Sequence, residues 1–256
     1  QHPDFASHTS FQYLAHRPWD MPAGRWTWRQ SWQDLLFAHW PVPAEVIRPL
    51  VPAALNVQEF DGASWIGIVP YRMAGVMRRP LPDMPWVSAF PELNVRVYVE
   101  AGGKPGVWFL SLDATNPLVV ATARALFHVP YHHAAISVES SGEAFQYRSR
   151  RFAGNARKGM DAVFEAEYRP VSDVYAAQPG TLEHFLTERY CLYARSPGGT
   201  LYRTEVHHRQ WPLQRAEAVV KHNTVAAAGG VLVSGPPSLL HFSRRIDVVV
   251  WPGTKA

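Results

Sequence analysis

A glutamate and two adjacent histidines have side chains that suit acid and base chemistry. Glu92 lies in the segment Phe90–Asn94, and His132 and His133 end the segment Val129–His133. Burial raises the pKa of a carboxyl, and a nearby carboxylate raises that of an imidazole, so such a pair can exchange protons near neutral pH. We expect Glu92 and one of the two histidines to meet in a partly apolar cavity. A structural hydrogen bond is the alternative for each residue alone.

Two polar residues accompany Glu92 at a spacing of two. Asn94 and Arg96 fall on the same side of an extended chain as Glu92, because side chains alternate along a strand. A guanidinium matches a carboxylate with two parallel hydrogen bonds, so Arg96 is a candidate for holding a substrate carboxylate, with Asn94 beside it. The alternative is an ion pair that stabilises the sheet.

A hairpin and a helix must position these groups. Apolar and polar residues alternate over 93–100, and the Gly-rich turn 101–106 leads into a second strand over 107–112. Thr115 or Asn116 then caps a helix over 118–127, with Pro117 at its first position. If this helix packs back along the sheet, it brings the two histidines near Glu92.

The remaining pattern is mainly β with about three helices. Extended segments are predicted over 26–37, 63–73, 134–139, 144–151, 162–168, 201–207 and 239–251, and helices over 43–51 and 182–193, while 216–228 fits either type. Hairpin links without regular βαβ alternation predict a closed antiparallel β-barrel with an interior for a small ligand. We expect residues 1–25 to form an arm and residues 26–256 one domain.

Composition removes several classes of function. The single cysteine, Cys191, excludes an intramolecular disulfide and is expected to be a buried apolar residue within the helix over 182–193. The phosphate-loop, dinucleotide-binding, nucleophile-elbow and H-E-x-x-H motifs are missing, and adjacent histidines point to opposite faces of a strand, so we expect no metal or other cofactor. The net charge of +4 comes from short, scattered arginine clusters, so we expect no nucleic-acid partner. No apolar run reaches the roughly 18 residues of a membrane span, and the expected location is the cytoplasm.

Several segments resemble a known group of proteins. The run from Phe109 to His133 is similar to the acetoacetate decarboxylase pattern of a strand ending in Leu-Asp, an Ala-rich helix and a Pro-Lys-Lys turn. Segments 37–41, 90–94, 130–133, 186–190 and 241–245 look like the uncharacterised bacterial YqjF-like proteins of the same superfamily. The resemblance implies a closed β-barrel of double-cone type around a buried cavity. It also implies that Glu92 is the active-site glutamate, that Arg29 lies near the substrate-binding arginine, and that His132, or His133, stands at the Schiff-base lysine position.

The lysine content argues against imine chemistry. The 25 basic residues divide into 21 Arg and only four Lys, at Lys104, Lys158, Lys221 and Lys255. A Schiff base needs a primary amine, which imidazole cannot supply. None of the four lysines is predicted near Glu92, so the sequence argues against a Schiff-base acetoacetate decarboxylase.

Three hypotheses about function remain. The first is an enzyme that performs non-covalent acid/base chemistry, of a lyase, dehydratase or enolising kind, on a small oxo- or hydroxy-acid, with Glu92 and His132 exchanging protons and Arg29 or Arg96 holding the carboxylate. The second is a barrel that binds or senses a small molecule without chemistry. The third is a scaffold that acts through a homo-oligomer interface, which only the aromatic excess supports.

Overall fold

The computed structural model describes residues 8–80, 88–152 and 161–256. Within them, 13 strands form one sheet. The strands are β1 (Trp28–Val42), β2 (Asn56–Val57), β3 (Ser64–Arg78), β4 (Phe90–Ala101), β5 (Lys104–Ala114), β6 (Tyr131–Ser141), β7 (Ala144–Arg151), β8 (Val163–Pro170), β9 (Cys191–Arg195), β10 (Leu201–His207), β11 (Gln214–Asn223), β12 (Leu239–Val250) and β13 (Thr254–Lys255).

The order of the strands is β13-β10-β9-β5-β6-β7-β8-β11-β12-β1-β3-β4-β2, with further pairings of β5 with β4 and of β10 with β12. Most neighbours are antiparallel, and the predicted hairpins β4–β5 and β6–β7 are confirmed. Two pairs, β5–β6 and β5–β9, are parallel, which the antiparallel prediction missed. The first of these arises because a helix crosses over between β5 and β6, as parallel neighbours require.

Four α-helices and two 3-10 turns lie among the described residues. The α-helices are α1 (Ala44–Ile47), α2 (Pro117–Phe127), α3 (Leu182–Thr187) and α4 (Val225–Ala228), and the 3-10 turns are η2 (Thr9–Gln12) and η3 (Arg48–Leu50). The Asn116 side chain accepts hydrogen bonds from the Leu118 and Val119 amides, so the predicted cap and Pro117 start of α2 are confirmed. The ambiguous segment 216–228 is a strand followed by a single helical turn.

The helix predicted over 182–193 is wrong in its second half. α3 ends at Thr187, and Cys191 begins a strand that pairs with Glu205. The Glu188 carboxylate accepts hydrogen bonds from the Tyr190 hydroxyl and the Trp211 amide, which draws the chain out of the helix. Tertiary contacts therefore override the helical spacing of the apolar residues. Cys191 is buried, as predicted, although it lies in β9.

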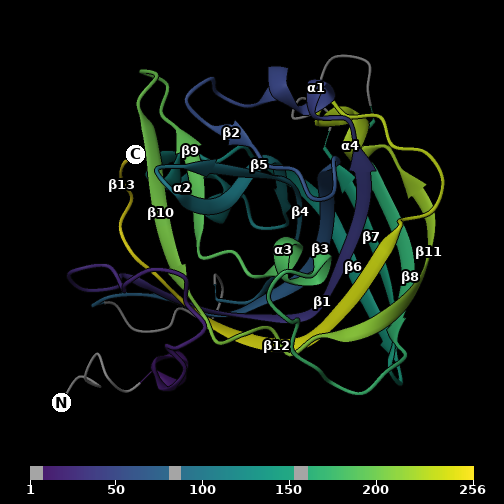
Figure 1. The fold of residues 1–256 in the computed structure, drawn as a ribbon. Coiled ribbons are helices and arrows are strands. Elements are labelled where there is room, and N and C mark those ends of the chain that lie inside the picture. Colours follow the sequence, from purple (N-terminus) through teal and green to yellow (C-terminus); the bar gives the residue numbers. More distant parts are fainter. Residues whose placement is uncertain (1–7, 81–87, 153–160) are drawn as a thin grey trace.

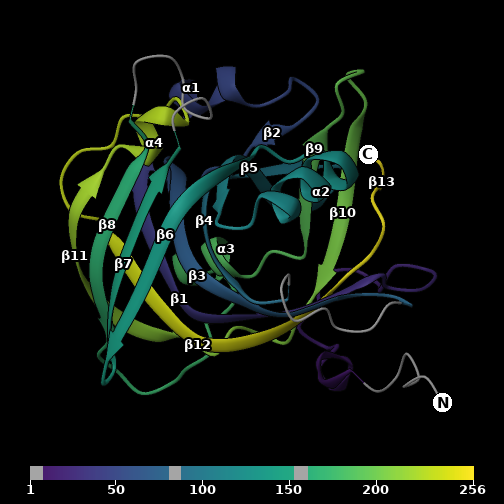
Figure 2. The same ribbon diagram turned by 180° about the vertical axis from the view of Figure 1, so that it is seen from behind.

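The sheet curves around the middle of the molecule (Figures 1 and 2). Strands β9 and β10 lie on one side and β6, β7, β8 and β11 on the other, while the long strands β1, β3 and β12 run between them. Two large apolar clusters pack inside this arrangement, and β4 supplies Leu93, Val95, Val97 and Val99 to the larger one. α1 and α4 lie together at one end, where Ile47 and Val225 join that cluster.

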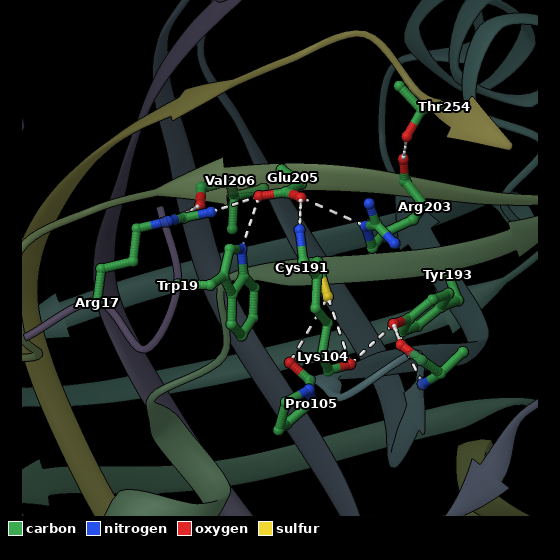
Figure 3. A network of polar contacts seen from close by, with 11 residues as sticks. Arg17, Trp19, Lys104, Pro105, Cys191, Tyr193, Arg203, Glu205, Val206 and Thr254 are labelled. Atoms are coloured by element: carbon green, nitrogen blue, oxygen red, sulfur yellow. Dashed lines mark hydrogen bonds and ion pairs between the residues drawn. The ribbon is translucent and has the colours of Figure 1, made fainter. Parts of the chain in front are cut away.

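The N-terminal segment is fixed to β10 by a buried carboxylate, Glu205 (Figure 3). One carboxylate oxygen accepts hydrogen bonds from Arg17 (2.6 Å) and from the Trp19 indole (2.8 Å). The other accepts from Lys104 at 2.8 Å and lies 3.3 Å from Arg203. The Arg17 and Glu205 side chains are 2% and 9% exposed, so this part of the segment belongs to the packed protein.

None of the described helices is long and apolar enough to cross a membrane.

Candidate functional site

A cavity of about 520 Å³ lies against the side of β4 that faces away from the larger apolar cluster. Its wall is mainly apolar and aromatic, with a few polar side chains, which is typical of small-molecule sites. The polar lining residues include Gln30, Tyr71, Arg78, Glu92, Asn94, Arg96, Thr122, Tyr131, Thr187, Arg189, Cys191, Thr204 and His208.

Strand β4 presents Glu92, Asn94 and Arg96 to this cavity, as the spacing of two predicts. Both faces of β4 are buried: the valines enter the apolar cluster and the polar residues line the cavity. An alternating strand therefore hides its polar face where the fold encloses a polar site.

Glu92 is 1% exposed and sits between two tyrosines. The Tyr71 hydroxyl donates to one carboxylate oxygen, and the Tyr131 hydroxyl donates to the other at 2.8 Å. Tyr71 lies directly opposite Glu92 in the β3–β4 register, and Tyr131 starts β6 beside Leu112 of β5. Three strands thus converge on one carboxyl group.

The pKa of Glu92 is raised from its usual value to about 7. Burial is the main cause; the hydrogen bonds from Tyr71 and Tyr131 oppose it, and the nearby carboxylate of Asp113 adds to it. Burial and the neighbouring Glu92 charge in turn raise the tyrosine pKa values well above the usual range, so both phenols stay protonated. Glu92 is therefore present in both protonation states near neutral pH, as an acid/base group needs to be.

Asp113 is the second buried carboxyl of this region. It accepts a hydrogen bond from Arg151 (2.9 Å), and both side chains are almost fully buried. Burial raises the pKa of Asp113 to about 6, against the opposing charge of Arg151. Asp113 is not among the residues that line the cavity, and its negative charge disfavours ionisation of Glu92.

Two buried arginines form a different polar group in the same cavity. Arg96 donates to the Tyr98 hydroxyl (3.3 Å) and the Leu186 carbonyl (3.0 Å). Arg189 donates to the Phe185 carbonyl (2.7 Å) and to the Gln58 side chain. Burial, together with the nearby charge of Arg96, lowers the pKa of Arg189 to about 10, which leaves it charged at neutral pH.

Other predicted site residues are not brought to the cavity. His132, His133 and Arg29 are not among its lining residues, so the expected meeting of Glu92 with a histidine is not observed there. The His133 ring bonds the Thr115 carbonyl (3.0 Å) and packs against Phe152. His132 stands opposite Asp113 in the β5–β6 register, one residue beyond Tyr131, and adjacent strand residues face opposite sides. Arg29 lies between Trp28 and Gln30, which line the cavity, and so faces the other side of β1.

Sequence reasoning missed the two tyrosines and Arg189. Tyr131 directly precedes the histidine pair, so a register shifted by one residue would have found it. Tyr71 requires the β3–β4 register, and Arg189 lies in a segment predicted as helix, where nothing marked it as facing a cavity.

The described lysines lie away from the cavity wall. Lys104 pairs with Glu205, Lys221 pairs with Glu167 on the surface, and Lys255 lies in β13. Lys158 falls outside the described residues. Within the same described ranges, no three His, Cys, Asp or Glu side chains gather as metal ligands.

A family model described as an uncharacterized conserved protein, DUF2071, matches residues 29–247. The chain belongs to the DUF2071 family. A curated relative, the uncharacterized protein YqjF of Bacillus subtilis (strain 168), is 42% identical over 232 residues, which cover 91% of this chain and 93% of that protein. Both findings confirm the predicted likeness to YqjF-like proteins.

Solved structures show the fold of this DUF2071 protein to be acetoacetate decarboxylase-like. The acetoacetate decarboxylase of Legionella pneumophila matches with a TM-score of 0.59 at 13% identity, covering 93% of both chains. An acetoacetate decarboxylase-like enzyme from Sphingomonas wittichii matches with 0.61 at 12% identity, over 94% of this chain and 98% of that one. The enduracididine biosynthesis enzyme MppR, complexed with pyruvate, also gives 0.61, at 13% identity over 94% and 93%.

Proposed function

We propose that this DUF2071 protein is an enzyme that performs non-covalent acid/base chemistry on an oxo- or hydroxy-acid bound in the cavity. The observation that carries the proposal is a cavity-lining carboxyl, Glu92, with a pKa of about 7 and a tyrosine hydroxyl on each oxygen. A general base works best when its pKa lies near the working pH.

The reaction best suited to this arrangement is enolisation. The Glu92 carboxylate takes a proton from the carbon next to a carbonyl group, the C–H electron pair forms a C=C bond, and the carbonyl π pair moves to oxygen. Once protonated, Glu92 donates to one tyrosine oxygen instead of accepting from that tyrosine. The hydroxyl hydrogen of Tyr71 or Tyr131 is then free to bond the new enolate oxygen, which stabilises it. In an isomerase reaction, the protonated Glu92 carboxyl then returns its proton to a different carbon. In a dehydratase reaction, it gives that proton to a β-hydroxyl group, the carbonyl re-forms as the enolate electron pair expels this group, and the hydroxyl leaves as water.

In this proposal Tyr131 takes the place beside Glu92 that was predicted for His132 or His133. Tyr131 reaches the Glu92 carboxylate from the start of β6, while neither histidine lines the cavity. An imine route is not part of the proposal, since a phenol and an imidazole both lack the primary amine that it needs.

The proposal includes a closed barrel around the cavity. Its support is the order in which the strands pair. Starting from β5 and passing through β6, β7, β8, β11, β12, β1, β3 and β4, the pairings return to β5. Closure of this kind leaves no free edge along those strands and encloses an interior.

The test is hydrogen–deuterium exchange of a substrate panel in D₂O, followed by proton NMR. We expect the protein to catalyse exchange next to the carbonyl of at least one straight-chain or aryl oxo-acid, and Glu92→Gln to abolish it. Glu167→Gln, on an exposed ion pair, is the matched control and should exchange at the wild-type rate. Exchange that persists in Glu92→Gln, or a borohydride-trapped lysine adduct, would overturn the proposal.

A second candidate is a carrier or sensor that binds the same molecules without chemistry. The apolar wall of the cavity favours it, because such a wall gives affinity but takes no part in proton transfer. Saturable binding of an oxo-acid that shows no catalysed exchange would support this candidate and contradict the enzyme.

A further inference from the structure

Two arginine side chains are buried in the cavity wall without an ion-pair partner among the described residues. Arg96 and Arg189 are 8% and 6% exposed, and neither forms an ion pair with Asp or Glu within the described part of the chain. The carboxylate of Glu100 acts on the charge of Arg189 only from beyond Gln58, which bonds both side chains. Their nearest groups are neutral oxygens and aromatic faces: both guanidinium carbons lie within 5.5 Å of the Tyr98 ring centroid. A buried charge is costly unless it is paired, so a pair of them in a cavity calls for an anion.

Each guanidinium keeps donors for that anion. Within the described residues, Arg96 uses its Nε and Nη2 groups and Arg189 its Nε and Nη1 groups. Nη1 of Arg96 and Nη2 of Arg189 donate to no described group, and both side chains line the cavity. Two guanidinium groups on one aromatic ring present donors of the kind that suits a carboxylate.

We propose that Arg96 and Arg189 bind the carboxylate of an elongated monocarboxylic acid, whose apolar chain extends through the cavity towards Glu92. Arg96 lies four residues beyond Glu92 along β4, which corresponds to about 13 Å of strand. The Arg96 guanidinium leans further away, over Phe37 (5.2 Å) and Tyr98 (5.5 Å). A molecule that reaches both ends is therefore much longer than a three-carbon oxo-acid.

The remaining wall supports a chain without further charge. Residues such as Trp32, Leu35, Val69 and Phe109 line the cavity, and its volume of about 520 Å³ lies within the roughly 300–1,000 Å³ range of drug-sized ligands. A second carboxylate at the far end would lie against this apolar wall, or beside Glu92 in a longer acid, where burial and like charge disfavour its ionisation. The chemistry thus selects a medium-chain aliphatic or arylalkyl acid over a dicarboxylate.

The reactive group's place beside Glu92 rests on the proposed function, whereas carboxylate binding by the two arginines does not. The first experiment therefore measures binding alone, by calorimetry and by tryptophan fluorescence, using octanoate, octanamide, propanoate and octanedioate with the wild-type protein. Octanoate should bind at least about 10-fold more tightly than each of the others. Equal affinity for octanoate and octanamide, or no binding of octanoate, would overturn the proposal.

Variants then identify the residues. Arg189→Gln and Arg96→Gln should each weaken octanoate binding about 10- to 100-fold and leave octanamide binding within about twofold. Arg169→Gln, which removes an exposed surface arginine, is the matched control and should bind as the wild type does. Should a glutamine variant fail to fold, Arg189→Lys is measured in its place, since it keeps the positive charge. The affinities of the wild-type protein for octanoate and octanamide still decide whether the cavity binds a carboxylate. A folded Arg189→Gln protein with unchanged octanoate affinity contradicts the assignment.

Glu92→Gln separates this proposal from the proposed function. It should retain octanoate binding, because the amide removes no donor of either arginine. If octanoate binds as expected but Glu92→Gln leaves substrate exchange unaltered, the enzyme proposal fails and the carboxylate site stands. If exchange depends on Glu92 but octanoate binds no more tightly than octanamide, the carboxylate site fails and the enzyme proposal stands.

Discussion

Two buried carboxylates of this protein, Glu92 and Glu205, differ in the groups that surround them. Glu205 accepts from Lys104 and the Trp19 indole, and Arg17 ties it to the N-terminal segment (Figure 3). Burial alone would raise its pKa, but these bonds and the charges of Lys104 and Arg17 outweigh burial and lower it. Glu205 is therefore a permanent anion that anchors a segment.

Glu92 accepts hydrogen bonds from two neutral hydroxyls, and burial prevails over them, so its pKa rises to about 7. The same side chain can thus fix a structure or exchange a proton, depending on whether its donors carry charge. Substitutions of the donors or of the acceptor at each position test this difference.

The largest expected effect is on the Glu205 side. Glu205→Gln leaves the buried Arg17 without its counter-charge and should lower the free energy of unfolding by about 4 kcal/mol at pH 7. The folded pKa of Glu205 is lowered, so its stabilisation is present above the unfolded pKa and is lost as pH falls through the folded value. Urea unfolding at pH 7 and pH 4 measures both. A difference from wild type that stays equal at the two pH values would contradict the anchor role.

Glu92→Gln should raise the free energy of unfolding relative to wild type, whereas Glu205→Gln lowers it. Below about pH 4.5 the carboxyl is protonated in both the folded and the unfolded states; between that pH and about 7 only the unfolded state ionises, so the wild type loses about 3 kcal/mol of stability. The glutamine variant lacks this loss. Urea titrations from pH 4.5 to 8 should show it gaining about 3 kcal/mol relative to wild type as pH rises. Glu167→Gln, the exposed control, should show no such trend.

Removing one hydrogen-bond donor should raise the pKa of Glu92 further above the usual glutamate value. Tyr131→Phe deletes the 2.8 Å hydrogen bond that favours the ionised form and should raise the pKa of Glu92 by about 1 pH unit. NMR titration of the side-chain carboxyl measures the change. Tyr175→Phe, away from Glu92, is the control, and an equal shift in both variants would mean that the Tyr131 bond is not responsible.

The smallest effect is expected at Lys104, whose side chain is 27% exposed and shares Glu205 with Arg17. Lys104→Met should cost about 1 kcal/mol of unfolding free energy, and less at high salt. Urea unfolding at low and high ionic strength measures it. A loss as large as that of Glu205→Gln would show that Lys104, rather than Arg17, dominates the anchor.

Local patterns predicted much of the fold. The β4–β5 hairpin and the Asn116 cap of α2 each depend on a few neighbouring residues, which the sequence displays directly. The prediction of a helix over 182–193 was wrong in its second half, because contacts with Trp211 and β10, which are distant in sequence, decide the conformation there. The crossover that makes β5 and β6 parallel is likewise set by packing.

The site was predictable where one strand carries it. Glu92, Asn94 and Arg96 share a face by simple alternation, and the structure brings all three to the cavity. The residues of other strands that contact Glu92 could not be predicted. Which residue of β6 faces Glu92 depends on the β5–β6 register, and a shift of one position changes it. That single position separates Tyr131 from His132. A charge-bearing residue on an irregular segment, such as Arg189, leaves no periodic signal.

The most direct measurement of the central claim is the pKa of Glu92 in the intact protein. Carbon-13 NMR of the glutamate side-chain carboxyls, with the Glu92 signal assigned by its loss in Glu92→Gln, follows the group across the pH range. We expect a midpoint near pH 7 for Glu92, and we expect the Glu205 carboxyl to be ionised already well below that pH. A Glu92 midpoint at or below the usual glutamate value would contradict the claim that the cavity holds an acid/base carboxyl.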